Sequence, residues 1–338
     1  MVARVSVIVL NFNGAPFIDD LMTSLNEQTF RDFEVVFVDN ASTDLSISKL
    51  HYLLKSECFR HLKVQIIINR SNLGYCAGNN IGLAHASGDY IVFLNNDVFV
   101  EPTWLKELIE VLDSNPSVGA CQSLILFALK QEVHSAGMML DVYGWSYGVP
   151  VKEYVDIMED GIFYPMGTSV IVRRSILDSC GGFDELVFSG DYDLGWRIRL
   201  CGYKIATSTR SVCYHYGGHA TNALYTHPEQ YYEACKERIY VLLKNYSIAR
   251  IVLRIPVSIA FMFFGTTAWS WRTRKNYLNS LSEAMIWNLK NFQKLVAERK
   301  RVQRERKIPD KEIENAMSHY PLMILLYKIL SSKKPRIH

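Results

Sequence analysis

The chain has 338 residues, of which 49% are hydrophobic and 21% charged, a composition that excludes a disordered or collagen-like protein. This length allows one large α/β domain with an appendage. The formal net charge is only +3. Residues 1–235 contain 16 Lys and Arg against 27 Asp and Glu (−11), whereas residues 236–338 contain 21 against 7 (+14). The basic segment indicates a polyanionic partner, either a nucleic acid or an anionic membrane surface.

The seven cysteines are scattered along the chain without a CxxC pair. They favour neither a zinc site nor a disulfide framework, and they indicate a reducing compartment. The apolar run at residues 5–10 is too short for the hydrophobic region of a signal peptide, and no small-residue cleavage site follows it. We therefore expect a cytoplasmic protein.

The first hundred residues alternate strand and helix patterns. Continuous apolar runs typical of buried strands lie at residues 5–10, 33–38, 64–68 and 90–94. Amphipathic stretches predict three helices between these runs. One lies at residues 16–28, one follows the second run and ends at about residue 54, and one extends from about residue 78 to residue 86. This alternation predicts a Rossmann-like α/β fold with a mostly parallel central sheet. Ligands of such sheets bind beyond the carboxyl ends of the strands, where polar clusters follow each run.

The rest of the chain has two different patterns. Residues 118–225 are less regular, with short strands at 169–172 and 204–206 and one helix starting near Asp193. From Tyr231 onward the pattern is helical and basic. We therefore divide the chain into residues 1–230, with a nucleotide-binding half to about residue 117 and an acceptor half from about residue 118, and a helical basic region at 231–338.

Three polar clusters after predicted strands have the chemistry of a nucleotide site. Asp39 can accept hydrogen bonds from a nucleobase or a ribose, or it can cap the next helix. The segment with Arg70 and Gly74 combines a cation, glycines and helix N-terminal N–H groups suited to a diphosphate, or it is only a flexible connection. Asp97 can hold Mn²⁺ or Mg²⁺ against a diphosphate, or it can form an Asx turn.

Two acids and two histidines complete the candidates. Asp193 is expected as the cap or first-turn acid of its helix, and Asp191, just outside that helix, as a general base in the cleft. Capping alone explains one of these two acids. His215 and His219 follow a short strand, and either can be a metal ligand, touch the diphosphate or be structural.

Taken together, these segments resemble the family-2 glycosyltransferases, which have the GT-A fold. The resemblance covers roughly residues 3–220, in order and at the family's spacing. Asn95-Asn96-Asp97 and residues 135–141 are similar to the rhamnosyltransferase-type branch. The matching motifs are residues 5–14, Val38-Asp39-Asn40-Ala41-Ser42-Thr43-Asp44, Asn72-Leu73-Gly74 with Gly78 and Asn80, Leu94-Asn95-Asn96-Asp97, Gly167, Gly181-Gly182-Phe183-Asp184-Glu185, Asp191-Tyr192-Asp193-Leu194 with Arg197, Gly202-Tyr203 and His215.

The resemblance implies an inverting transfer of a sugar from a nucleotide-diphospho-sugar, such as dTDP-rhamnose or a UDP-sugar, to a hydroxyl of a glycan or lipid-linked acceptor. Asp191 would be the catalytic base, and Asp97 with His215 would bind Mn²⁺ or Mg²⁺. Asp39 would read the base. The donor pocket would also contain Asn11, Asn13, Arg70, Asn72, Gly74, Asn80 and Asn96, and the acceptor side would contain Gly167, Asp193 and Arg197.

The sequence departs from the family pattern at two positions. The metal motif, often Asp-x-Asp, is Asn95-Asn96-Asp97 here, which leaves one carboxylate and predicts weaker metal binding or a share for His215. The Glu that usually precedes the catalytic Asp is Gly190. The base therefore lacks an acidic neighbour that could tune its pKa.

The basic region contains an uncharged run of 17 residues, 255–271, at the lower limit for crossing a bilayer. Basic residues flank it, and Trp269 and Trp271 lie at one end, as interfacial aromatic residues do. We expect this element to lie in an anionic membrane surface, which would place the protein at the inner face of the cell membrane. A transmembrane helix and a helix buried in a dimer or a C-terminal domain are the alternatives.

Other functions explain less of the sequence. A nucleotidyltransferase would share the first strands and a metal-binding Asp, but it leaves Asp191 unexplained. Nucleic-acid binding is not expected, because no motif accompanies the basic region and its aromatic residues do not interleave with the basic ones. A non-catalytic nucleotide-sugar binder is the third alternative, and a homodimer stays open.

Overall fold

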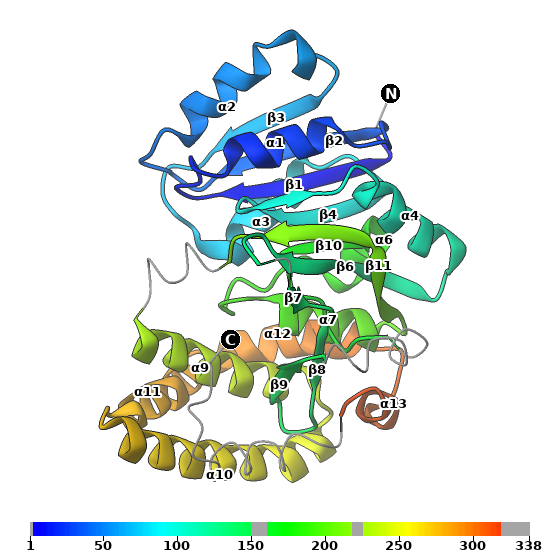
Figure 1. The fold of residues 1–338 in the computed structure, drawn as a ribbon. Helices are drawn as coiled ribbons and strands as arrows, with labels where there is room; N and C mark the ends of the chain where they lie inside the picture. The colour runs from blue at the N-terminus through cyan, green and yellow to red at the C-terminus, as the bar shows by residue number, and fades with distance from the viewer. Residues whose placement is uncertain (1–2, 131, 150–160, 218–225, 319–338) are drawn as a thin grey trace. The chain divides into compact units, whose positions relative to one another are not determined.

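The computed structural model describes residues 3–130, 132–149, 161–217 and 226–318 (Figure 1). The chain divides into two compact units, one of Met1–Met138 with Gly148–Leu224 and one of Met139–Tyr147 with Tyr225–His338. The sequence division at residue 230 places residues 139–147 in the acceptor half, whereas contacts group them with the second unit. His219 lies outside the described residues.

The first unit is built on a nine-stranded sheet among the described residues, in the order β3-β2-β1-β4-β10-β6-β11-β5, with β7 paired to β6 (Figure 1). The strands are β1 Val5–Asn11, β2 Phe33–Asp39, β3 Lys63–Ile68, β4 Tyr90–Asn95, β5 Val98–Val100, β6 Val118–Phe127, β7 Val133–Ser135, β10 Ser169–Arg173 and β11 Lys204–His215.

The sheet is mixed, so the prediction of a mostly parallel sheet is wrong. The pairs β1–β2, β2–β3, β1–β4 and β6–β11 are parallel. Strand β10 is antiparallel to β4 and β6, β5 is antiparallel to β11, and β7 is antiparallel to β6. Parallel neighbouring strands need long, usually helical connections, so the helices predicted between the first strands indicated that these strands are parallel. The less regular region after residue 118 gave no such signal.

Helices cover both faces of this sheet. On one face Leu21, Leu50 and Trp104, from α1, α2 and α4, share a buried core with Val7. Ile8 points to the opposite face, where it packs closely against Gly82 of α3. Helix α3 starts four residues before the predicted start. The helices of this unit are α1 Ile18–Asn26, α2 Ser46–Leu54, α3 Gly74–His85, α4 Trp104–Ser114, α6 Arg174–Cys180 and α7 Asp191–Leu200, with a 3₁₀ turn at Glu57–Phe59.

The part of the second unit described from Thr226 onward is helical, as the sequence predicts. Its core contains Cys235, Ile239, Met262, Leu281 and Ala284. A hairpin of β8 and β9 contributes residues 139–147 to this unit. The elements are β8 Met138–Leu140, β9 Ser146–Gly148, α9 His227–Asn245, α10 Ile248–Thr273, α11 Tyr277–Lys290, α12 Phe292–Glu305 and α13 Asp310–Asn315.

Candidate active site

The carboxyl ends of β1, β2 and β4 carry a connected set of polar side chains. Asn11 ends β1 and lies in register with Asp39, the last residue of β2. The Nδ2 group of Asn11 donates to Oδ1 of Asp39 at 2.8 Å, and Nδ2 of Asn96 donates to Oδ1 of Asn11 at 2.8 Å. A hydrogen-bonded chain, buried at Asn11 and Asp39 and partly buried at Asn96, therefore crosses three adjacent strand ends, at the edge where the sequence predicts the donor.

Asp39 is held in the sheet edge rather than used as a helix cap. Its carboxylate accepts the hydroxyl of Ser42 at 2.6 Å and the N–H of Ser42 at 3.0 Å. Asn13, in the left-handed region with φ +51°, accepts the N–H of Thr43 on its Oδ1 at 2.8 Å. At the start of α2 the first N–H is instead accepted by Asp44. The capping alternative for Asp39 is therefore wrong.

Asn40, which the sequence analysis did not single out, organises the loop that leads into α3. Its Nδ2 group donates to Oδ1 of Asn72 at 2.9 Å and to the carbonyl of Gly74 at 3.1 Å. Arg70 and Asn72 are exposed in this loop, and Gly74 begins α3. The signal that could have revealed Asn40 is its position directly after Asp39, since the end of β2 adjoins this loop.

Asp97 and His215 come together because β5 pairs with β11. Val98 lies opposite His215, and the N–H of Tyr216 donates to the carbonyl of Asp97 at 3.0 Å. As a result, Nε2 of His215 lies 3.2 Å from Oδ1 of Asp97. Both side chains are buried, 6% and 7% exposed, and the geometry at Nε2 does not make a hydrogen bond.

These two residues fit adjacent positions around a divalent cation. Oxygen ligands of Mg²⁺ lie at about 2.0–2.1 Å, so neighbouring ligands of an octahedral ion are about 3 Å apart, close to the Asp97–His215 separation. No cluster of three acidic, histidine or cysteine side chains suited to a metal occurs among the described residues. A cation here would therefore take its remaining ligands from the diphosphate and water.

His134, on β7, is a further residue that sequence reasoning missed. Its Nδ1 lies 3.1 Å from Nδ1 of His215, and the two rings stack with centroids 5.1 Å apart. On its other side His134 stacks on Phe127, with centroids 4.2 Å apart. When Nδ1 of His215 is the donor in this contact, its Nε2 presents a lone pair, the form that binds a metal. No sequence signal marks His134, because its position depends on the β6–β7 hairpin.

Asp191 is the first residue of α7, so its predicted place outside the helix is wrong. Gly190 precedes it with φ +74°. A Cβ atom at residue 190 would lie 2.6 Å from Cδ1 of Phe183 and 2.7 Å from Sγ of Cys76. The Glu that the family resemblance leads one to expect has no room in this backbone, which explains the departure at Gly190.

Gly167 and Tyr75 surround the carboxylate of Asp191. The N–H of Gly167 donates to Oδ2 of Asp191 at 2.8 Å, and the hydroxyl of Tyr75 donates to the carbonyl of Gly167 at 3.1 Å. Burial, and then the charge of the neighbouring Asp191, raise the pKa of the Tyr75 hydroxyl well above its ordinary value. A Cβ atom at residue 167 would lie 2.2 Å from both Oδ1 of Asp191 and the Tyr75 oxygen. Only glycine fits there.

Three predicted site residues support the loop at residues 180–183 instead. Arg197 is 1% exposed, and it donates to Oδ2 of Asp193 at 2.7 Å and to the carbonyls of residues 180, 181 and 182. Asn80 donates to the carbonyl of Phe183 at 2.9 Å and accepts its N–H at 2.9 Å. These contacts use the polar atoms within the protein. We therefore correct the predictions that Asn80 lines the donor pocket and that Asp193 and Arg197 face an acceptor.

A family model, "Glycosyl transferase family 2", matches residues 6–181 of this chain. The chain belongs to glycosyl transferase family 2. This membership makes it a glycosyltransferase, and the match spans the strand ends, the Asp97 position and Gly167. The rhamnosyltransferase-like branch stays a prediction.

Known proteins similar to this chain agree with the family. A glycosyltransferase of Haemophilus influenzae is 27% identical over 67% of this chain and 69% of its own length. The amylovoran biosynthesis glycosyltransferase AmsB of Erwinia amylovora is 28% identical over 59% of this chain and 65% of its own length. The mannosyltransferase PcManGT of Pyrobaculum calidifontis, solved with GDP-Man and Mn²⁺, is 18% identical with a TM-score of 0.56, over 99% of this chain and 89% of its own. The structural likeness shows an α/β GT-A-like fold.

Proposed function

We propose that this glycosyltransferase moves a sugar from a nucleotide-diphospho-sugar to a hydroxyl of a glycan or lipid-linked glycan, with inversion at the anomeric carbon. The observation that carries the proposal is the short path between the Asp191 carboxylate and the end of β4. Gly167, which binds Asp191, is followed by Thr168, whose carbonyl accepts the N–H of Asn95 at 3.0 Å. A base is thereby held near the segment that carries Asp97.

The donor nucleotide is proposed to bind at the ends of β1 and β2. A carboxylate offers about four lone-pair positions, and three hydrogen bonds from Asn11 and Ser42 reach Asp39. The remaining position can accept an N–H of the base or a ribose hydroxyl. Arg70, exposed in the loop before α3, supplies a cation for the diphosphate.

We propose that Asp97 and His215 hold a divalent cation, Mn²⁺ or Mg²⁺. When bound, such an ion neutralises charge on the departing diphosphate. His134 orients His215 through the contact between their Nδ1 atoms. The Mn²⁺ in the structure of PcManGT supports the use of a divalent cation, without indicating which residues bind it.

Asp191 is proposed to take the proton from the acceptor hydroxyl as that oxygen attacks the anomeric carbon. One base is sufficient for a single displacement with inversion. The N–H of Gly167 and the neighbouring Tyr75 fix the carboxylate, so that its orientation does not have to be found at each turnover.

The acceptor and the location of the protein complete the proposal. The name of AmsB supports a polysaccharide as the product. We propose that residues 1–230 act on the sugar, with dTDP-rhamnose or a UDP-sugar as donor. The basic C-terminal region would place the chain at the inner face of the cell membrane, beside a lipid-linked acceptor, as a monomer or homodimer.

The first experiment measures thermal stabilisation by dTDP, UDP and GDP, each with and without Mn²⁺. A ligand at a hundred times its Kd adds about 2.7 kcal/mol to the free energy of unfolding, which raises Tm by several degrees. We expect a metal-dependent rise with one nucleotide in the wild type and its loss in Asp97→Asn. No rise with any of the three would contradict the donor site.

The second experiment separates a transferase from a non-catalytic binder. Asp191→Asn is expected to keep the nucleotide-dependent rise in Tm and to lose about 10²- to 10⁴-fold in transfer rate, measured as release of the nucleoside diphosphate. Asp178→Asn, at an exposed position of α6, is the matched control and should transfer at the wild-type rate. Wild-type turnover in Asp191→Asn would remove this residue from the mechanism.

A further inference from the structure

Helix α10 turns an apolar surface toward solvent along its whole length. Of the described helices, this 26-residue one is long and apolar enough to cross a membrane, and few residues of its apolar window are buried in the protein. Six large apolar side chains lie exposed on one face of it. This apolar stripe consists of Ile248 (65% exposed), Val252 (70%), Leu253 (52%), Phe263 (52%), Phe264 (68%) and Trp271 (87%).

The face of α10 that packs on the protein is less apolar than the stripe. Its buried residues are Ile255, Ser258, Met262 and Thr266. Ser258 donates to the carbonyl of Tyr143 at 2.8 Å, and the Thr266 hydroxyl bonds with that of Tyr231. A helix of a water-soluble domain normally has its polar side outward, so this inverted arrangement indicates an apolar partner on the stripe.

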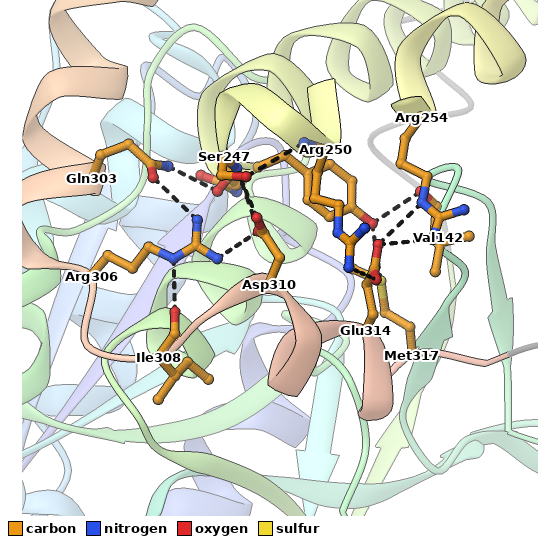
Figure 2. A network of polar contacts seen from close by, with 12 residues as sticks. Val142, Ser247, Arg250, Arg254, Gln303, Arg306, Ile308, Asp310, Glu314 and Met317 are labelled. Atoms are coloured by element: carbon orange, nitrogen blue, oxygen red, sulfur yellow. Dashed lines mark hydrogen bonds and ion pairs between the residues drawn. The ribbon is translucent and has the colours of Figure 1, made fainter. Parts of the chain in front are cut away.

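The charged residues around α10 suit a partner that presents both an apolar interior and an anionic surface, as a membrane with anionic lipids does. Arg250 and Arg254, on the flank of the helix, are paired with Glu314 at 3.0 and 3.1 Å (Figure 2). At the other end, Trp271 is followed by exposed Arg272, Arg274 and Lys275. A tryptophan beside cations, at the end of an apolar stripe, matches the boundary between lipid tails and anionic headgroups.

The packing of α10 favours a helix lying in the membrane plane over one that crosses it. Asp310 accepts the N–H of Ser247, just before α10, and pairs with Arg306 (Figure 2). Helix α9, which packs on α10, carries the Lys236–Glu233 ion pair. If α10 crossed the membrane, these charged side chains would enter the hydrocarbon core, where ionised groups are energetically unfavourable.

We propose that the apolar stripe of α10 is a membrane-binding surface, seated between the headgroups and acyl chains of an anionic bilayer with the helix axis in the membrane plane. Only the biological purpose of this surface, which is access to a lipid-linked acceptor, rests on the proposed function. The surface itself follows from the stripe, the inverted packing and the basic end of α10.

Flotation with lipid vesicles tests the surface without using catalysis. The wild-type protein is expected to float with phosphatidylcholine vesicles that contain phosphatidylglycerol, and to bind less at high salt. Phe263→Ser with Phe264→Ser should weaken binding at least about tenfold, because both side chains lose their transfer from water to lipid. Leu45→Ser with Tyr52→Ser is the control, since those side chains are 72% and 77% exposed in the first unit and should leave binding unchanged.

Two further measurements identify the occupant of the stripe. Vesicles should shift Trp271 fluorescence to shorter wavelength, brominated lipids should quench it, and Trp271→Phe should lose this signal. Sedimentation equilibrium of the wild type and the Phe263/Phe264 variant tests a second copy of the chain. A wild-type dimer that becomes a monomer in the variant, with vesicle binding unchanged, would overturn the proposal.

The same preparations are tested for the nucleotide-dependent rise in Tm. A variant that loses vesicle binding but keeps this rise separates the membrane surface from the donor site. A wild-type protein that shows the rise but does not float with anionic vesicles overturns the membrane surface and leaves the proposed function standing.

Discussion

The backbone N–H of Gly167 donates a 2.8 Å hydrogen bond to Oδ2 of Asp191. There is no space for a side chain between them, because a Cβ atom at residue 167 would lie 2.2 Å from Oδ1 of Asp191. Gly167→Ala must therefore displace the carboxylate or the Tyr75 hydroxyl. Since a displacement of about 1 Å can cost about 10²-fold in rate, we expect kcat to fall 10- to 100-fold while nucleotide binding, measured by the rise in Tm, stays.

Gly148→Ala is the matched control for this variant. A Cβ atom there meets no heavy atom within 4 Å, and Gly148 lies on β9, outside the candidate site. We expect its kcat to equal that of the wild type. Equal losses in the two variants would show that the effect of Gly167→Ala does not come from Asp191.

His134→Phe tests whether His134 positions His215. The phenyl ring retains the stack on Phe127 but removes the nitrogen that lies 3.1 Å from Nδ1 of His215. Loss of a partner behind a metal ligand typically lowers metal affinity 10- to 100-fold. We therefore expect a 10- to 100-fold higher Mn²⁺ concentration for half-maximal stabilisation by the nucleotide, with little change in stability when Mn²⁺ is absent.

The control for His134→Phe is His51→Phe, at an exposed position of α2. It should leave the Mn²⁺ titration at the wild-type midpoint. If His134→Phe also leaves that midpoint in place, His134 is only a packing residue against Phe127.

Local patterns of the sequence predicted the first half of the fold well. The apolar run at residues 33–38 forms β2 almost as predicted, because a buried strand between two helices is specified by its own residues. The direction of β10 could not be predicted from its own residues. It depends on pairing with β4 and β6, which are more than forty residues away in the chain.

The candidate site divides in the same way. Asp39 and Asp97 follow predicted strands, so the sequence placed both at the sheet edge correctly. His134 and Asn40 acquire their roles only through partners, His215 and the loop before α3, that the fold supplies. Arg197 was misassigned to the acceptor side because a functional cation and a buried structural one have the same sequence pattern.

The contacts of the Glu34 carboxylate are expected to make the protein less stable in acid. Partial burial alone would raise the pKa of its carboxyl, but hydrogen bonds from Ser6 and Ser87 and the charge of Lys63 hold that pKa below its ordinary value. Stability from a depressed pKa is present above the ordinary value and is lost as pH falls through the folded one. The free energy of unfolding should therefore fall more steeply between about pH 6 and about pH 3 in the wild type than in Glu34→Gln.

Urea denaturation at several pH values measures this difference. Glu57→Gln is the control, because the Glu57 side chain is 83% exposed in its pair with Arg60, and its curve should run parallel to that of the wild type. Parallel curves for Glu34→Gln and the wild type would mean that the contacts of Glu34 with Ser6 and Ser87 do not contribute to acid sensitivity.

Substitution of Arg197 is expected to lower the stability of the protein rather than its affinity for the acceptor. Burial alone would lower the pKa of the guanidinium, but the charge and hydrogen bond of the Asp193 carboxylate next to it hold that pKa above its ordinary value. The guanidinium also donates to the carbonyls of residues 180, 181 and 182. Lys cannot reproduce these forked contacts, and breaking a buried pair costs about 3–5 kcal/mol. We expect Arg197→Lys to lower the free energy of unfolding by at least about 2 kcal/mol in urea.

The control is Arg210→Lys, because the Arg210 side chain is 68% exposed beside Glu107 and Glu110. This variant should change the free energy of unfolding by less than about 1 kcal/mol. An Arg197→Lys variant with wild-type stability and a raised acceptor KM would return Arg197 to the acceptor side.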